Sequence, residues 1–420
     1  MNLKGKRVAI IGLARSGVSL AKMISGVGGR VCISEKAAFD PAKHSFAGWF
    51  EQQNFETEFG GHTVAFIEKS DLVVVSPGVN IKAEPVLWAK AKKVPVIGEI
   101  ELAWRFCPCP VIAVTGSNGK TTTVTLIQRI LEAAGHKAVV CGNIGFPFSD
   151  HVLGLTKDHW VVLEVSSFQL ESIVEFRPKI GVILNFSQNH LDRHTDLEEY
   201  FNAKKRIFEN QTRDDFAVLN DQTPRLHVLA GELMSQARFF NTPQMKRQYP
   251  SLNPNHLAAI TVAGILGIGP EICRKVFDNF RGVEHRLEWV RQIEGVDFIN
   301  DSKSTTTEAG RWALENVQRP IVMICGGRDK HIDFAVLREL VKQKVKKMVV
   351  IGESREKIKN TFADVVIVEA ADDLKSAVCL AQGLSQRGDV VLFSPMCTSF
   401  DMFANFEERG RVFKTIVNEL

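Results

Sequence analysis

Residues 111–127 read VIAVTGSNGKTTTVTLI, a β-branched apolar run that passes through a glycine-rich turn into a helical pattern. In a strand, turn and helix of this kind, backbone N–H groups and the positive end of the helix dipole converge on the turn. The stretch therefore predicts a phosphate-binding loop, with Lys120 reaching the phosphates and the Thr121 hydroxyl binding Mg²⁺. The general pattern G-x-x-x-x-G-K-[ST] has a glycine where this chain has Val114. A glycine turn without a ligand is the alternative, which the complete strand, turn and helix disfavour.

Two later strands of the same block end in side chains suited to a metal ion. The strand WVVLEVSS carries Glu164, a carboxylate in an apolar run where a purely structural role would bury a charge. The next strand, IGVILNF, leads into SQNHLDRH, which supplies His190 and Asp192 at the same end of the sheet. Glu164 in a structural ion pair and a structural histidine are the alternatives. The position beside the predicted phosphate loop favours metal binding and catalysis.

Length and composition limit the class of protein. A chain of 420 residues predicts two to four domains, and 45% hydrophobic with 24% charged residues is typical of a globular protein. The net charge of +4, with scattered basic residues, argues against a nucleic-acid binder. The eight cysteines lack zinc-site spacing and are expected to be reduced thiols. No apolar run approaches the ~20 residues of a membrane span, and the short run from Val8 to Leu13 predicts a first strand rather than a signal peptide.

Short β-rich runs alternate with helical patterns, which is typical of parallel sheets with crossover helices. The runs fall into three blocks, so we expect an α/β protein of three domains. These are a Rossmann-like domain at 1–98, a central domain with a P-loop ATPase-type parallel sheet at 99–281, and a second Rossmann-like domain at 282–420. The strands predicted in the first block read RVAIIGL, RVCIS and DLVVVSPG, and VPVIGEIELAW closes that block. Those of the second block read CPVIAVT, KAVVCG, WVVLEVSS and IGVILNF, and those of the third read DFIND, PIVMICGG, KMVVIG, VVIVEA and DVVLFSP.

The first block carries a weak dinucleotide fingerprint. Gly12 and Gly17 fit G-x-G-x-x-G, but Ala14 replaces the middle glycine. Glu35 ends the second predicted strand, where an acidic residue could meet a ribose hydroxyl. A nicotinamide site and a site for a single nucleotide diphosphate both remain open.

In the third block, three polar loops follow predicted strands: NDSKSTT (300–306), GGRDKHIDF (326–334) and SPMCTSFDMFANFEERG (394–410). Parallel strands place such loops at one edge of the sheet, where ligands bind. Solvated loop charges are the alternative for any single residue. Together the three loops favour a second ligand surface.

These motifs, taken together, resemble the Mur ligases. The resemblance covers essentially the whole chain and lies in TGSNGKTTT, EVSSFQLE, NFSQNHLDRH, AKKRIF, EHRLE, NDSKST, GGRDK and SP-x-C-x-S-F-D-x-F-x-NFEERG. SSFQLE and NFEERG are specific to the members that add D-glutamate to UDP-N-acetylmuramoyl-L-alanine. The resemblance implies a UDP-sugar domain, an ATP domain and an amino-acid domain, with ATP as co-substrate and one or two Mg²⁺ ions. It also implies an acyl-phosphate mechanism, no nucleic-acid partner, no membrane insertion, a monomer and a bacterial cytoplasmic location.

The resemblance assigns roles to particular positions. The UDP part would be held by Arg15, Ser16, Glu35, Lys36, Ser76, Pro77 and Gly78. The ATP contacts would be Gly116, Ser117, Asn118, Gly119, Lys120, Thr121 and Thr122, with Asn255 at adenine and Arg286, Asp301 and Lys303 from the linker and the third domain. D-Glutamate would meet Thr305, Lys330, Ser399 and Phe400, with Phe406 nearby. The reacting carboxylate would face Asn143 and His190, and the metal ligands would be Thr121, Glu164, His190 and Lys204, the last as a carbamate.

Some features depart from the family pattern. Ala14 replaces a glycine, Asn189 stands where an acidic residue is common, and Thr306 replaces an asparagine. Lys205 beside Lys204 leaves the register of the carbamate open. The rival interpretations are a related ligase for another amino acid or for folate glutamylation, and a nucleotide-binding sensor without ligase chemistry. The presence of Glu164, His190 and Lys204 favours a ligase, because binding alone does not require them.

Overall fold

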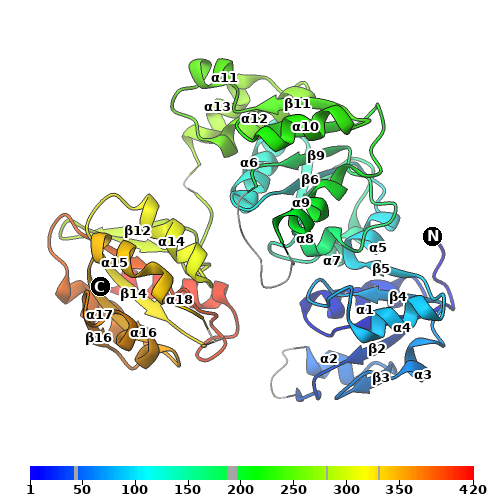
Figure 1. Cartoon of the computed structure of the whole chain (residues 1–420), viewed down its shortest axis with the longest axis horizontal. Coiled ribbons are helices and arrows are strands. Elements are labelled where there is room, and N and C mark those ends of the chain that lie inside the picture. The colour runs from blue at the N-terminus through cyan, green and yellow to red at the C-terminus, as the bar shows by residue number, and fades with distance from the viewer. Residues whose placement is uncertain (42–45, 187–195, 281, 330–331) are drawn as a thin grey trace. The chain divides into compact units, whose positions relative to one another are not determined.

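The computed structural model describes residues 1–41, 46–186, 196–280, 282–329 and 332–420. By its internal contacts the chain divides into two compact units, Met1–Phe280 and Arg281–Leu420. Figure 1 shows helices packed around three separate sheets, two in the first unit and one in the second. The predicted three-domain α/β fold is confirmed, whereas the boundaries at residues 98 and 281 stay predictions. Among the described residues, no helix combines the length and apolar character needed to cross a membrane.

The N-terminal sheet is parallel, with strand order β3-β2-β1-β4-β5. Its strands are β1 Arg7–Ile11, β2 Arg30–Glu35, β3 Glu56–Phe59, β4 Leu72–Val75 and β5 Val96–Gly98, and its helices are α1 Arg15–Gly26, α2 Ala47–Glu51, α3 Val64–Ile67 and α4 Glu84–Ala91. β1 pairs with β2 on one side and β4 on the other. The carboxyl ends of β1 and β4 therefore form the crevice where open α/β sheets bind ligands.

The central sheet is also parallel, with strand order β11-β10-β9-β6-β8-β7. Its strands are β6 Val111–Thr115, β7 Lys137–Gly142, β8 His159–Glu164, β9 Ile180–Ile183, β10 Phe216–Asn220 and β11 Gln236–Phe240. The helices around it are α5 Glu99–Phe106, α6 Lys120–Ala133, α7 Phe148–His151, η2 Val152–Gly154, α8 Ser167–Leu170, α9 Leu197–Lys205, η3 Arg206–Phe208, α10 Pro224–Glu232, α11 Pro243–Gln248, α12 Pro254–Ile265 and α13 Pro270–Asp278.

β6 is buried on both faces, as an interior parallel strand must be. Ile112 and Val114 join the apolar cluster that includes residues of α6 and α12. Val111 and Ala113 point the other way, into the cluster that includes residues of α5. Burial on both faces explains why this strand reads as a continuous apolar run, and it fixes the position of the loop that follows.

The C-terminal sheet is mixed, with strand order β12-β13-β17-β14-β15-β16. Its strands are β12 Glu288–Ile293, β13 Val296–Asn300, β14 Ile321–Gly326, β15 Val345–Ile351, β16 Ile367–Ala370 and β17 Val390–Phe393, and its helices are α14 Thr307–Asn316, η4 Ala335–Leu337, α15 Arg338–Lys344, α16 Arg355–Phe362, α17 Leu374–Leu384 and α18 Phe406–Glu419. β12 runs antiparallel to β13 through a turn at Glu294 and Gly295, both with positive φ. The carboxyl ends of the adjacent strands β13, β17 and β14 lie at one edge.

Candidate active site

The predicted phosphate loop lies between β6 and α6. Gly116 has φ +152° and Gly119 has φ +81°, so both positions favour glycine. A Cβ on Gly119 would lie 2.3 Å from Asn255 Oδ1, which places Asn255, predicted to contact adenine, against the loop. The Lys120 ammonium donates to the carbonyls of Gly116 at 2.9 Å and Ser117 at 3.0 Å. The loop is therefore wrapped around the amine that we predict to meet phosphate.

Asn185 fixes the loop from the neighbouring strand. It lies two residues after the end of β9. Its side-chain oxygen accepts a hydrogen bond from Asn118 N at 2.9 Å, and its side-chain nitrogen donates one to Asn118 O at 3.0 Å. Sequence reasoning did not single out Asn185, although its place just beyond a buried strand was a usable signal. Thr122, the last residue of the predicted phosphate set, lies in the first turn of α6.

Glu164 ends β8 and is 2% exposed. Its Oε2 accepts from the Thr121 hydroxyl at 2.8 Å, and its Oε1 accepts from Asn143 Nδ2 at 2.8 Å. A hydroxyl and a carboxylate thus meet next to the phosphate loop. Oxygen donors of this kind are the ligands Mg²⁺ prefers, so the residues present fit the ion. The structure therefore brings together three predicted residues from α6, β7–α7 and β8.

Lys204 lies on α9 and is 2% exposed. Its ammonium nitrogen lies 3.1 Å from Gly116 O, 3.3 Å from Thr115 Oγ1 and 4.5 Å from the centre of the Tyr200 ring. Burial, reinforced by the nearby Lys120 charge, holds the pKa of Lys204 well below its ordinary value. Lys205 is only half-buried, so the structure places Lys204 and not its neighbour beside the loop. The predicted residues His190 and Asp192, and the departure Asn189, lie outside the described residues.

The predicted UDP-binding residues lie at the end of β2 and in the segments that follow β1, β2 and β4. Arg15 and Ser16 begin α1, and Glu35 accepts from Leu13 N at 2.6 Å and from Ala37 N at 3.0 Å. Ser76 donates its hydroxyl to Gly12 O at 2.8 Å, which joins the loops after β1 and β4. A Cβ on Gly17 would lie 2.1 Å from Gly12 O, so this glycine permits the close approach of α1. Lys36, Pro77 and Gly78 lie in the same loops, and Ala14 is the N-cap of α1.

In the C-terminal unit, Asp301 follows β13 and is 3% exposed. It accepts from Leu287 N at 3.2 Å and from the Ser394 hydroxyl at 2.8 Å, and burial raises its pKa to about 7. Lys303 N donates to His285 O at 3.0 Å, and the Lys303 amine lies 5.7 Å from the centre of the Phe406 ring. Arg286 lies over the Trp312 ring at 5.7 Å. The linker residues and the loop after β13 are thus held together.

The predicted D-glutamate residues lie at the same sheet edge. Ser399 is 2% exposed, Thr305 and Phe406 are half-buried, and Phe400 is 56% exposed. Lys330 lies outside the described residues. Thr306 caps α14 by accepting from Ala309 N, which gives this departure from the family pattern a structural role. Ser304 Oγ is buried without a hydrogen-bond partner among the described residues, beside this set.

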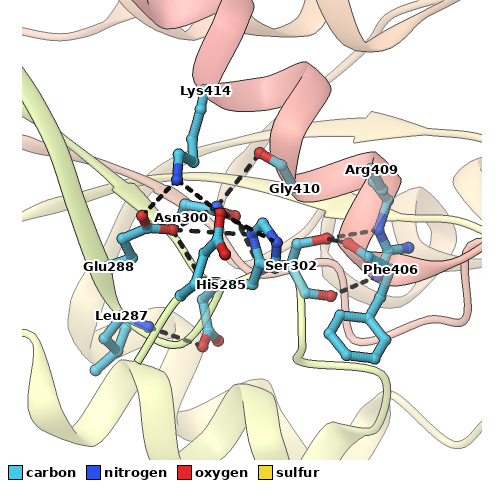
Figure 2. A network of polar contacts seen from close by, with 11 residues as sticks. His285, Leu287, Glu288, Asn300, Ser302, Phe406, Arg409, Gly410 and Lys414 are labelled. Atoms are coloured by element: carbon cyan, nitrogen blue, oxygen red, sulfur yellow. Dashed lines mark hydrogen bonds and ion pairs between the residues drawn. The ribbon is translucent and has the colours of Figure 1, made fainter. Parts of the chain in front are cut away.

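Two buried side chains that the sequence did not single out support this edge (Figure 2). Arg409 of α18 donates to Ser302 Oγ at 3.0 Å, to Ser302 O at 2.7 Å and to Cys397 O at 3.0 Å, which ties the loops after β13 and β17. His285 accepts from Asn300 Nδ2 at 2.9 Å. The carboxylates beside His285 belong to Glu284 and Glu288, and both accept from the ammonium of Lys414, at 2.9 Å and 2.7 Å. Lys414 and the two carboxylates thus form an ion-pair network around His285.

Three successive parts of the chain match descriptions of Mur ligase domains. The family description "Mur ligase MurD-like, N-terminal domain" matches residues 6–98, "Mur ligase middle domain" matches 114–248, and "Mur ligase, glutamate ligase domain" matches 285–397. The chain is 38% identical to a protein of Caldicellulosiruptor saccharolyticus over all of both chains, and 39% identical to one of Acidobacterium capsulatum over 99% of this chain and 97% of the relative. Both relatives are named "UDP-N-acetylmuramoylalanine--D-glutamate ligase".

Solved structures share the fold at low sequence identity. The Thermotoga maritima ligase MurC is 17% identical, with a TM-score of 0.58 over 99% of both chains. MurF of the same organism, solved with ADP, is 15% identical, with a TM-score of 0.59 over 99% of this chain and 96% of that one.

Proposed function

The chain belongs to the Mur ligase family, and from this premise we propose that it joins D-glutamate to UDP-N-acetylmuramoyl-L-alanine with hydrolysis of ATP to ADP and phosphate, a step of peptidoglycan precursor synthesis. The observation that carries the proposal is the buried Glu164, bound by Thr121 and Asn143 at the end of the phosphate loop. A domain that only binds nucleotide would not require Glu164, His190 and Lys204 together. The predictions of a monomer and of a cytoplasmic location stay predictions.

The chemistry begins with a carboxylate, which is a poor acylating agent because oxide would have to leave. One oxygen of the muramoyl-alanine carboxylate attacks the γ-phosphorus of ATP, the bond to the β-phosphate oxygen breaks, and ADP leaves. The product is an acyl phosphate. Lys120, which already lies within the loop, offsets the repulsion between the two anions and stabilises the transferring phosphoryl group.

The amine of D-glutamate then attacks the acyl carbon. The tetrahedral intermediate collapses, the bond from carbon to the phosphate oxygen breaks, and the nitrogen loses a proton as the amide forms. Asn143 and His190 are the residues we assign to the reacting carboxylate. Thr305, Lys330, Ser399 and Phe400 are assigned to the amino acid, whose two carboxylates need cationic and hydroxyl donors.

Thr121, Glu164 and His190 would hold Mg²⁺, and Lys204 would join them if it became an anionic carbamate. The ion would supply positive charge against the phosphate oxygens. The neutral amine that burial favours at Lys204 is the form that adds to carbon dioxide, with loss of one proton.

The test is ADP release from ATP and Mg²⁺ with UDP-N-acetylmuramoyl-L-alanine, with and without D-glutamate. We expect release that depends on both substrates, and loss of at least about 100-fold in Lys120→Ala. D-Glutamate, L-alanine and diaminopimelate, offered side by side, separate this activity from that of a ligase for another amino acid. Binding of ATP without release under any of these conditions would instead identify a sensor.

A further inference from the structure

A tight turn at residues 142–146 connects β7 to α7. Gly142 N donates to Phe146 O at 2.9 Å, and Gly142 and Gly145 have φ of +104° and +63°. A Cβ on Gly142 would lie 2.4 Å from Glu164 O, and Asn143 N donates to that same carbonyl at 2.9 Å. The turn is therefore held firmly against the end of β8, where Asn143 also binds the Glu164 carboxylate.

The other end of the turn reaches the first domain. Phe146 is 55% exposed, so part of its ring surface is left open by the core. The guanidinium carbon of Arg15 lies over its ring, 4.8 Å from the centre. The His151 ring meets Phe146 at 85° with the centres 5.9 Å apart. One face of Phe146 thus carries the arginine, while the contact with His151 restrains the orientation of the ring.

Arg15 is the first residue of α1, at the positive end of a helix of 12 residues and at the crevice between β1 and β4. We propose that Phe146 is a positioning residue that holds the Arg15 guanidinium, by a cation–π contact, in the place where it binds the diphosphate of the UDP-linked substrate. The inference rests on the proposed function. It gives the turn a definite task, since Asn143 at one end serves the reacting carboxylate and Phe146 at the other orders the residue that anchors the diphosphate.

Substitutions at Phe146 separate the ring face from simple bulk. Phe146→Leu keeps apolar volume and removes the π face, whereas Phe146→Trp keeps the face. In the full-length enzyme we expect Phe146→Leu to raise the KM for UDP-N-acetylmuramoyl-L-alanine about three- to tenfold. The KM values for ATP and D-glutamate and the kcat should stay within about twofold of wild type. Phe146→Trp should restore the wild-type KM. Val228→Ala, a change at another exposed apolar side chain, is the matched control because Val228 is 67% exposed on α10.

A double-mutant cycle shows whether Phe146 acts through Arg15. Arg15→Ala should raise the same KM, and adding Phe146→Leu should raise it no further. Full additivity, a KM unchanged in Phe146→Leu, or equal damage in Phe146→Trp would overturn the inference. A fall in kcat together with a lower melting temperature would instead assign Phe146 a purely structural role. Wild-type protein that releases no ADP with this substrate would refute the proposed function itself, which is a separate result.

Discussion

At the scale of single residues, the surroundings of Lys204 strongly affect the protonation state of its buried amine. It lies 3.1 Å from a carbonyl of the phosphate loop, and its lowered pKa favours a neutral amine able to react with carbon dioxide. We predict that Lys204→Ala lowers ligation about 100-fold or more, and that a short carboxylic acid added to the assay partly restores it. The measurement is ADP release with and without the added acid.

Lys205 provides the matched control for this prediction. It follows Lys204 on α9 but is half-buried, and among the described residues the hydrogen bonds to the loop come from Lys204 and not from Lys205. Lys205→Ala should therefore keep activity within about twofold of wild type. Turnover like that of wild type in Lys204→Ala, or equal loss in both variants, would show that the carbamate assignment is wrong.

The buried carboxyl of Asp301 leads to a prediction about how the stability of the protein depends on pH. Burial raises the pKa of its carboxyl from 3.8 to about 7, so between these values the folded protein holds a proton that the unfolded chain has lost. Its contribution to the free energy of unfolding therefore falls as pH rises through that window, and is constant above it. Asp301→Asn keeps the shape but does not titrate. Between about pH 5 and about pH 8, the free energy of unfolding of the variant should therefore rise by roughly 2 to 3 kcal/mol relative to that of wild type.

Urea unfolding of the full chain at a series of pH values measures this difference. Comparison with the variant removes the contribution of the other titrating groups, because they are common to both proteins. Curves that run parallel from acid to neutral pH would show that Asp301 is ionised throughout, held so by the nearby Arg286 and Arg409 charges.

At the scale of elements, burial explains part of which strands could be predicted from the sequence. Interior strands such as β6 and β14 are buried on both faces and read as apolar runs. The edge strands β3, β11 and β12 expose much of their length, lack such a run and were not predicted. The edge strand β16 is also largely exposed, but it was predicted because its residues belong to the apolar run VVIVEA. β10, which is largely buried, carried a usable signal and was also missed.

The residues of the candidate site that lie at strand ends could be predicted from the sequence. Residues such as Thr121 and Glu164 lie in the chain at the ends of strands or the start of a helix, so the topology of a parallel sheet alone brings them together. The choice of partners could not be predicted. Arg409 binds loops that precede it in the sequence, and Phe146 meets Arg15 in another domain. Such contacts depend on how elements pack, which neither spacing nor periodicity encodes.

At the scale of the whole molecule, the two compact units have separate cores. The apolar clusters of Met1–Phe280 contain no residue of Arg281–Leu420 in the part of the chain that the structure describes. Each unit should therefore unfold as its own cooperative transition. The predicted contacts divide unevenly between them, because all residues predicted to bind UDP belong to the first unit, whereas residues predicted to bind ATP occur in the sequence of both.

This division leads to a prediction for ligand-induced stabilisation. A ligand stabilises the unit it binds, by about 2.7 kcal/mol when present at 100 times its Kd. UDP should raise the melting temperature of the first unit and leave that of the second unchanged. A non-hydrolysable ATP analogue with Mg²⁺ should raise the melting temperatures of both units, that of the second through its predicted contacts with Arg286, Asp301 and Lys303. In the Lys120→Ala variant, we expect the analogue to raise neither melting temperature. Calorimetry measures the transitions, and hydrogen exchange read by mass spectrometry assigns each to its unit. If the analogue left the second transition unchanged, those three residues would not be nucleotide contacts, whereas a single transition would mean that the units unfold together.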